Sequence, residues 1–196
     1  YIAIFIMLIV HSIILMIFGY NPFKYYSKAL PTLAFAFSSR TSAGTLPMTV
    51  DTLKNKMGIS EGVSNLSASL AVTIGQNGCA GIYPAMVVAM IAPTLGINVF
   101  EPVFLIKVVI IIAIGSFGIA GVGGGATNAA LITLSALNFP VELVAILLGI
   151  EPLIDMGRTL LNVNDGMITA AATGKICKEV DIAKFNSNNT AASENS

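Results

Sequence analysis

The chain has 196 residues, of which 55% are hydrophobic and 10% charged, and it contains no tryptophan. Its mean hydropathy is +0.84, whereas soluble domains carry about 25% charged residues, so the composition predicts a protein embedded in a lipid bilayer. The ten basic and ten acidic residues give zero net charge and form no dense basic stripe, which argues against a nucleic-acid-binding surface. Cys79 and Cys177 lie in unrelated contexts without metal-ligand spacing, so neither a metal site nor a structural disulfide is expected from them.

Residues 1–20 read YIAIFIMLIVHSIILMIFGY, which matches the length of about 20 apolar residues that a membrane-spanning helix needs. This transmembrane helix is expected to end before the Asn21-Pro22 pair. His11 lies near its middle and is interpreted as a helix-packing or snorkelling side chain, with a proton relay as the alternative. Because the chain starts at Tyr1 inside this apolar segment, we interpret it as the C-terminal part of a longer protein.

Two later segments share a plan in which short apolar stretches flank a polar or glycine-rich tip. In residues 24–57 the tip is SSRTSAGT, and in residues 102–137 it is GSFGIAGVGGGATN. The glycines of the second tip disfavour a helix, because each costs about 1 kcal/mol in a helix interior. Neither apolar stretch of the first segment is long enough to span a bilayer. Both segments are therefore predicted to be helical hairpins.

Two spanning segments complete the predicted order. Residues 61–95 are mildly apolar and are interrupted by GQNG at 75–78 and by Pro84, which predicts a transmembrane helix that is broken near its centre. Residues 141–174 are predicted to form the last transmembrane helix. Residues 175–196 are polar and are predicted to be a disordered tail.

Lysine positions predict the orientation, since cytoplasmic flanks of membrane segments carry an excess of basic residues. Lys28 and Lys54 flank the first hairpin and Lys175 follows the last helix, whereas no lysine adjoins Glu101 or Glu142 at the ends of the second hairpin. The first hairpin is therefore expected to enter from the cytoplasm and the second from outside, with a cytoplasmic C-terminus. Two hairpins that enter from opposite faces form an inverted-topology repeat, which in transporters places the binding site near the midplane.

The last predicted helix carries EPLIDMGRTLLNVNDG at 151–166. At 100° per residue, several of its polar side chains fall within an arc of about 60°: Glu151, Asp155, Arg158 and Asn162. A charge at the centre of a membrane helix costs on the order of 2.5 to 3.5 kcal/mol, so these side chains are expected to face a bundle interior or an aqueous cavity. A purely structural alternative is an internal salt bridge between Asp155 and Arg158.

The chemistry of these side chains suits an amino acid that carries an additional anionic group. Asp155 is a fixed anion suited to an ammonium group, and Arg158 offers a planar fork suited to a carboxylate. Asn162 and Thr159 can orient both groups. Unpaired backbone amides at the hairpin tips can bind a second carboxylate.

The motifs SSRTSAGTLP at 38–47, GIAGVGGGA at 118–126 and DMGRTLLNV at 155–163 resemble the dicarboxylate/amino acid:cation symporter family, which contains the glutamate transporters. The resemblance covers nearly the whole chain. It implies an all-α polytopic membrane protein in which these segments form an elevator-type transport domain with two re-entrant hairpins and inverted-repeat topology. It also implies a homotrimer in the cell membrane, in which lipid surrounds a static scaffold that is mostly absent from this chain.

Within the family, IGQNGCAGIYPA at 74–85 and EPLIDMGRT at 151–159 look most like the bacterial proteins for L-cystine uptake. This resemblance implies a symporter that imports L-cystine with a coupling cation. The family's first-hairpin serine motif falls on Thr41 to Ala43, its substrate-amine aspartate on Asp155, and its carboxylate-binding arginine on Arg158. The implied substrate-binding set consists of Arg40, Thr41, Ser42, Ala43, Gly121, Val122, Gly123, Asp155, Arg158, Thr159 and Asn162.

The coupling-ion site departs from that of the sodium-coupled members. Their Asn-Met-Asp-Gly-Thr motif corresponds to GQNGC at 75–79, and the aspartate near the end of their last helix falls on Gly166, with Asp165 one residue early. Sodium prefers oxygen ligands, with negative charge among them. One interpretation is therefore a sodium site formed by Gly75, Asn77, Asn162 and Asp165. The other is proton coupling, with Glu151 as the buried acid that carries the proton. No tightly bound cofactor is expected.

Other functions are weighed against the same residues. A symporter for dicarboxylates or for aspartate and glutamate would also keep Arg158. An intramembrane hydrolase needs a nucleophile with a base, or two acids that face each other, whereas His11 is expected on a distant helix and Glu151 and Asp155 share one helix. The sequence GVGGGATN at 121–128 lacks the Lys-Ser/Thr ending and the strand context of a phosphate loop. Neither an enzyme nor a nucleotide site is expected.

Overall fold

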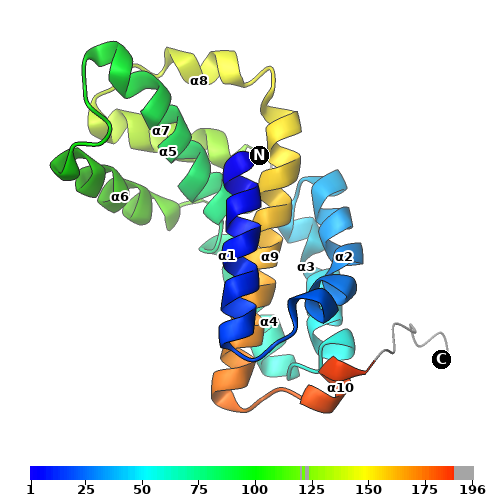
Figure 1. Cartoon of the computed structure of the whole chain (residues 1–196). Helices are drawn as coiled ribbons and strands as arrows, with labels where there is room; N and C mark the ends of the chain where they lie inside the picture. Colours follow the sequence, from blue (N-terminus) through cyan, green and yellow to red (C-terminus); the bar gives the residue numbers. More distant parts are fainter. Residues whose placement is uncertain (120, 122–123, 188–196) are drawn as a thin grey trace.

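The computed structural model describes residues 1–119, 121 and 124–187, and most of these residues are helical. Figure 1 shows a long column formed by α1, α2, α3, α4, α9 and α10, and a lobe formed by α5, α6, α7 and α8 beside one end of it. The elements in chain order are α1 (Ile2–Ile17), α2 (Pro22–Ser39), α3 (Ser42–Asp51), η1 (Thr52–Lys56), α4 (Glu61–Thr73), η2 (Asn77–Ile82), α5 (Tyr83–Ile91), η3 (Ala92–Leu95), α6 (Pro102–Ser116), α7 (Gly125–Leu137), α8 (Glu142–Leu147), α9 (Glu151–Cys177) and α10 (Ile182–Asn186).

Helix α9 is the axis of the column. It contacts α1, α2, α3 and α4, and it also contacts η2, a short π-helical turn. The contact with α4 requires a small residue, because a Cβ added at Gly166 would lie 2.6 Å from the Cβ of Ala71. Small residues at helix interfaces let backbones approach closely in membranes, where packing and hydrogen bonds hold helices together. As a result, α9 presents side chains to neighbours on several sides.

Buried apolar side chains form one main core in each part of the molecule. The column core includes Tyr25 and Met167, and the lobe core includes Val87 and Leu134. Between the two cores, η2 contacts α9 on the column side and α5, α6 and α7 on the lobe side. The junction of column and lobe is therefore built around the interruption between α4 and α5.

Helices α2 and α3 form a hairpin whose two ends lie together. The chain reverses at Arg40, which has a left-handed φ of 55°, and Thr41 then caps α3 by accepting the N–H of Gly44 at 3.1 Å. At the open end, the hydroxyl groups of Thr32 and Thr52 lie 2.8 Å apart. The segment 24–57 thus leaves one end of the column and returns to it.

The segment after α9 packs against that same end. The ammonium group of Lys28 donates to the carbonyl of Lys56 at 2.6 Å and to the carbonyl of Lys184 at 3.0 Å. In α10, Phe185 is 2% exposed and meets Tyr20 edge-on, with ring centroids 4.8 Å apart. The predicted disordered tail is therefore wrong for residues 175–187, because a few apolar side chains anchor this polar segment. The remaining residues of the predicted tail lie outside the described part of the chain.

The segment predicted to be a broken helix is interrupted after Thr73. The side-chain amide of Gln76 donates to the carbonyl of Ala71 at 2.7 Å, and the N–H of Gly75 donates to the same carbonyl at 3.2 Å. Among the described residues, Glu61–Leu95 is the one helical segment that is long and apolar enough by itself to cross a membrane. Helices α1, α6 and α7 are apolar but shorter.

The range predicted to be the last transmembrane helix, 141–174, contains two helices instead of one. Helix α8 ends at Leu147 and α9 begins at Glu151. Gly149 disfavours a continuous helix, and Pro152 in the first turn of α9 has no N–H to offer a carbonyl of α8. The charged stripe therefore starts in the first turn of α9.

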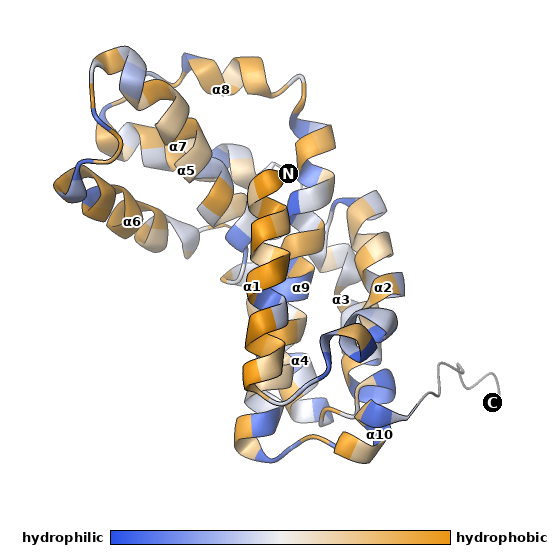
Figure 2. Ribbon diagram, in the orientation of Figure 1, coloured by the Kyte–Doolittle hydropathy of each residue, from blue (hydrophilic) through white to orange (hydrophobic). Residues whose placement is uncertain are grey.

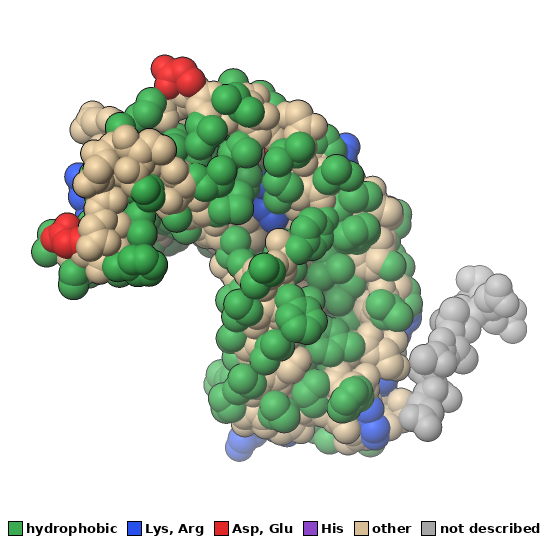
Figure 3. All heavy atoms as spheres, turned by 45° about the horizontal axis from the view of Figure 1, so that its top comes forward, with side chains coloured by type: hydrophobic (Ala, Val, Ile, Leu, Met, Phe, Trp, Pro, Cys, Tyr) green, Lys and Arg blue, Asp and Glu red, His purple; other side chains and the backbone are tan. Residues whose placement is uncertain are grey.

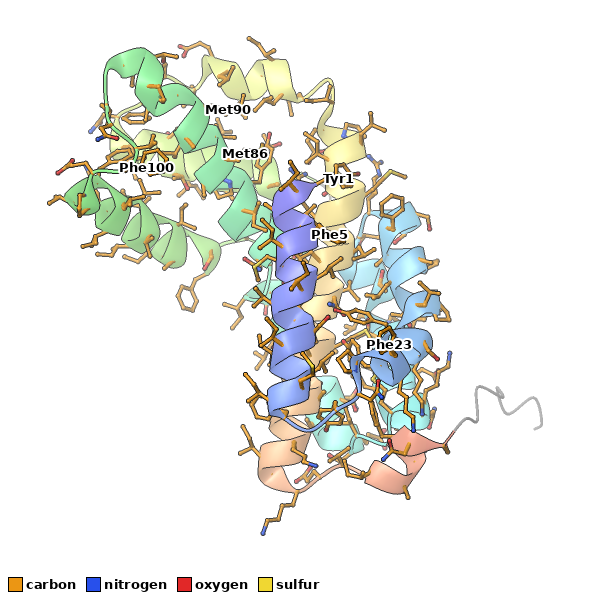
Figure 4. All side chains as sticks on the ribbon, viewed as in Figure 1. Tyr1, Phe5, Phe23, Met86, Met90 and Phe100 are labelled. Atoms are coloured by element: carbon orange, nitrogen blue, oxygen red, sulfur yellow. The ribbon has the colours of Figure 1, made fainter. Side chains whose placement is uncertain are left out.

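Helices α1 and α6 consist largely of apolar residues, as their hydropathy colouring in Figure 2 shows, and many of these side chains are exposed. Large apolar side chains that are exposed and labelled in Figure 4 are Tyr1, Phe5, Phe23, Met86, Met90 and Phe100. Figure 3 shows Lys and Arg side chains at the end of the column that carries α10, and acidic side chains on the lobe. An apolar exterior around buried charges is the pattern expected of helices that face lipid.

Candidate functional site

The charged side chains of α9 lie together, as their helical spacing predicts. The Nη2 atom of Arg158 donates to Oε1 of Glu151 and, at 3.2 Å, to Oδ1 of Asp155. Arg158 is 1% exposed and Asp155 is 6% exposed. The ring of Tyr83 on α5 lies against the guanidinium, with 4.3 Å between its centroid and Cζ of Arg158. An arginine on the column is thus enclosed partly by the lobe.

Only some of the hydrogen-bond donors of Arg158 are used by the described part of the chain. Within the described residues, its Nε and Nη1 atoms are buried and have no hydrogen-bond partner. A buried donor without a partner costs on the order of 1 to 3 kcal/mol, and a guanidinium fork matches a carboxylate. The salt bridge between Asp155 and Arg158, considered above as a purely structural alternative, is present, and it does not engage Nε or Nη1 of Arg158.

Asn162 joins α9 to the interrupted helix. Its Oδ1 accepts the N–H of Gly78 at 2.7 Å, and its Nδ2 donates to Oε1 of Gln76 at 2.9 Å. The sulfur of Cys79 lies 3.1 Å from the same Nδ2. Asn162, which the sequence places among both substrate and ion ligands, therefore has both polar atoms engaged with η2 and the residue before it. Thr159 is 3% exposed on the same helix.

The tips of the two hairpins meet beside the interruption. The N–H of Ala43 donates to the carbonyl of Gly121 at 3.1 Å, and the N–H of Gly121 donates to the carbonyl of Val72 at 2.7 Å. A Cβ at Gly121 would lie 2.9 Å from the Cβ of Ser42, so the close contact depends on glycine. The first tip, the second tip and the end of α4 are thus connected through one residue.

The other predicted hairpin residues have different surroundings. Arg40 is exposed at the turn between α2 and α3, and the side chain of Thr41 caps α3, so neither takes part in the contacts of Arg158 described above. Ser42 and Asn162 line a cavity of about 10 Å³ between α3, α4 and α9, which is at the lower limit for one water molecule. The first tip is thus packed closely onto α9. Val122 and Gly123 lie outside the described residues.

His11 belongs to a buried polar network that the sequence pattern did not reveal. Its Nε2 lies 2.6 Å from Oδ1 of Asp165, and its Nδ1 lies 2.9 Å from Nδ2 of Asn164. The hydroxyl of Tyr25 donates to Oδ1 of Asn164 at 3.0 Å. The expectation that His11 lies on a distant helix is wrong, because α1 packs along α9. The available signal was Asn164, since a buried amide on a membrane helix needs a polar partner on another helix.

Several of the predicted coupling-ion residues gather at two cavities. Gly75, Asn77 and Asp165 line a cavity of about 350 Å³ beside α6, and Gly75 and Asp165 also line one of about 320 Å³ between α4 and α9. The Oδ2 atom of Asp165 is buried and has no partner in the described ranges. Carboxylate, carbonyl and amide oxygens are the ligands that a hard cation prefers.

Metal centres are often built from several His, Cys, Asp or Glu side chains. Within residues 1–119, 121 and 124–187, no group of three or more such residues can hold a metal ion.

A helical chain with an apolar exterior, buried charges and an interrupted helix defines an α-helical membrane protein. The sequence profile of the sodium:dicarboxylate symporter family matches residues 1–176, and the chain belongs to this family. The resemblance drawn from the three motifs is thereby confirmed.

The similar proteins carry names that state a substrate. The chain is 49% identical over 194 residues to the L-cystine uptake protein TcyP of Bacillus cereus, a match that covers 99% of this chain and 42% of that protein. It is 53% identical over 189 residues to TcyP of Shouchella clausii, covering 96% and 40%, and 53% identical over 185 residues to TcyP of Bacillus subtilis, covering 94% and 40%. The chain therefore spans about two-fifths of the length of these curated relatives.

Proposed function

We propose that this chain is the substrate-binding transport domain of a symporter that imports L-cystine with a coupling cation. The observation that carries the proposal is Arg158, which is buried in contact with Glu151 and Asp155 and whose Nε and Nη1 find no partner among the residues that the structure describes. Cystine has an amino-acid group at each end. Asp155 suits the ammonium of one end and Arg158 the carboxylate of the other. The names of the similar proteins agree with this chemistry.

The hairpin α2–α3 is proposed to be re-entrant, so that it dips into the membrane and returns. The contact of Lys28 with the carbonyl of Lys56 supports this proposal, because both ends of the hairpin lie at one end of the column. Irregular backbone at membrane depth is tolerated where protein groups satisfy it. The bonds of Gly121 to Ala43 and Val72 supply such partners and support a second re-entrant hairpin at α6–α7.

The proposal includes an orientation and an assembly. The lysine-rich end of the column, which carries α10, is proposed to face the cytoplasm. The protein is proposed to cross the cell membrane several times and to have a cytoplasmic C-terminus. The column and lobe are proposed to move together as an elevator against a scaffold within a homotrimer. The two hairpins and their following helices then form the inverted repeat that binds substrate near the midplane.

Sodium is the proposed coupling cation, bound beside Asp165 with oxygens of Gly75 and Asn77. The shared cavity supports this site, as does the buried Oδ2 of Asp165, which has no hydrogen-bond partner in the described part of the chain. Asn162 is proposed as a further oxygen ligand. Proton coupling through Glu151 is the alternative. The contact of Glu151 with Arg158 commits that carboxylate to an ion pair, which favours sodium.

Radiolabelled L-cystine uptake into proteoliposomes of the full-length protein tests the proposal, with sodium and proton gradients imposed separately. We expect cystine uptake that a sodium gradient drives and that excess aspartate or glutamate does not inhibit. Strong inhibition by aspartate would indicate a symporter for acidic amino acids instead. Uptake under neither gradient would contradict the proposed function.

A further inference from the structure

The charged cluster on α9 holds one more negative charge than positive. In the part of the chain that the structure describes, Arg158 is the only basic group within 4.0 Å of Glu151 or Asp155. The side chains are 12%, 8% and 1% exposed for Glu151, Asp155 and Arg158 respectively. Two carboxylates that share one guanidinium away from water are incompletely compensated, and a further cation stabilises them.

A bound substrate changes the net charge of this cluster, and the direction of the change depends on the charged groups of the substrate. A substrate carboxylate that binds Nε or Nη1 of Arg158 adds a third negative charge beside a guanidinium whose Nη2 already donates to Glu151 and Asp155. An acidic amino acid brings a single ammonium group, which Asp155 takes, and so leaves Glu151 with a weakened partner. Leaving a buried charge without its partner is strongly unfavourable. A substrate with a second ammonium group supplies the missing partner.

Building on the proposed function, in which cystine is the substrate, we propose that Glu151 accepts the second ammonium group of a substrate with an amino-acid group at each end. Glu151 lies one helical turn before Asp155, or about 6 Å along the helix axis, with Arg158 in contact with both. One end of the substrate then pairs its ammonium with Asp155. The other end pairs its carboxylate with Arg158 and its ammonium with Glu151. The site thereby selects diamino dicarboxylic acids over acidic amino acids.

A pair of ligands that differ in one ammonium group isolates this contact. L-cystine is compared with the mixed disulfide of L-cysteine and 3-mercaptopropionate, which keeps the disulfide and the distal carboxylate but lacks the distal ammonium. Their affinities are measured by competition with radiolabelled L-cystine on the purified full-length protein. Because a hydrogen bond between charged groups is lost, we expect the wild type to prefer cystine by on the order of 10- to 100-fold.

Variants of Glu151 test whether its carboxylate causes the preference for cystine over the mixed disulfide. In Glu151→Gln, cystine affinity is expected to fall by about the same factor while the affinity for the mixed disulfide is kept, so that the ratio approaches one. Glu151→Asp retains the charge and is expected to retain most of the preference. Glu142→Gln, in the exposed first turn of α8, is the matched control and keeps the wild-type ratio.

The outcomes separate this inference from the proposed function. If the wild-type protein binds cystine and the mixed disulfide with equal affinity, the role of Glu151 is overturned and no variant is needed. The role is also overturned if Glu151→Gln prefers cystine as strongly as the wild type does. If Glu151→Gln does not fold, an unchanged preference after Glu151→Ala overturns the role in the same way. A wild type that binds neither ligand refutes the proposed function itself.

Discussion

Tyr83 on α5 lies against Arg158 on α9, with 4.3 Å between the ring centroid and the guanidinium carbon. The two residues come from different parts of the molecule, since α5 belongs to the lobe and α9 to the column (Figure 1). Tyr83 is 1% exposed, so the guanidinium stacks on the ring in a dry environment. The proposed substrate arginine is therefore held by acids on its own helix and by an aromatic ring from the lobe.

Removing that ring is expected to weaken substrate binding without abolishing it. A cation–π contact contributes about 0.5 to 2 kcal/mol, so Tyr83→Leu should raise the KM for cystine by roughly 2- to 30-fold. Tyr83→Phe keeps the ring and should stay within about 3-fold of the wild type, because the hydroxyl has no partner in the described residues. Uptake kinetics in proteoliposomes measure both. Equal losses in the two variants would contradict a stacking role.

Asp155→Asn is expected to abolish cystine uptake, because the neutral amide cannot replace the carboxylate as partner of an ammonium group. Initial uptake rates at saturating cystine provide the measurement, with folding of the detergent-purified variant checked by size-exclusion chromatography. Asp51→Asn is the matched control, since Asp51 is exposed on α3 and bonds locally to Asn55. Normal transport by the Asp155 variant would refute its role at the ammonium group.

Gly78→Ala is expected to destabilise the junction of η2 and α9. A Cβ at this position would lie 2.8 Å from the backbone carbonyl oxygen of Arg158, and such overpacking typically costs about 1 to 3 kcal/mol. Thermal unfolding of the detergent-purified full-length protein should show the lower Tm. Gly62→Ala is the control, since a Cβ there would meet nothing within 4 Å and alanine favours the helix by up to about 1 kcal/mol. A Tm that rises in both variants would rule out a tight junction.

Asp165→Asn is expected to impair coupling more than folding. The amide oxygen can still accept from Nε2 of His11, which lies 2.6 Å from the carboxylate, while the charge that favours a bound cation is removed. The sodium concentration for half-maximal uptake should rise by about 10-fold or more, corresponding to about 1.4 kcal/mol. Glu61→Gln, on the surface beside Lys54, controls for net charge. An unchanged sodium dependence would remove Asp165 from the ion site.

The order of the elements was largely predictable, because each boundary carries a local signal. Asn21 caps α2 through its side chain, Pro22 starts that helix, and the glycine-rich tip separates α6 from α7. The charged stripe was predictable for a different reason, since helical periodicity alone brings Glu151, Asp155 and Arg158 to one face.

Contacts between distant segments were harder to predict, because they depend on which helix faces which. Composition did not predict the anchored α10, since its few apolar residues stand in a polar segment and the burial of Phe185 against Tyr20 depends on the chain folding back. The pairing of His11 with Asp165 likewise depends on α1 lying along α9. Periodicity identifies the polar face of a helix but not the helix that satisfies it.

The role of Arg158 in cystine binding is best tested by equilibrium binding of radiolabelled L-cystine to the purified full-length protein, compared between wild type and Arg158→Ala. We expect saturable binding to the wild type and a loss of affinity of at least about 100-fold in the variant, because a buried charge pair loses one partner. Binding of small neutral amino acids, if present, should change far less. Equal affinity of the two proteins for cystine, or no cystine binding by the wild type, would contradict the account.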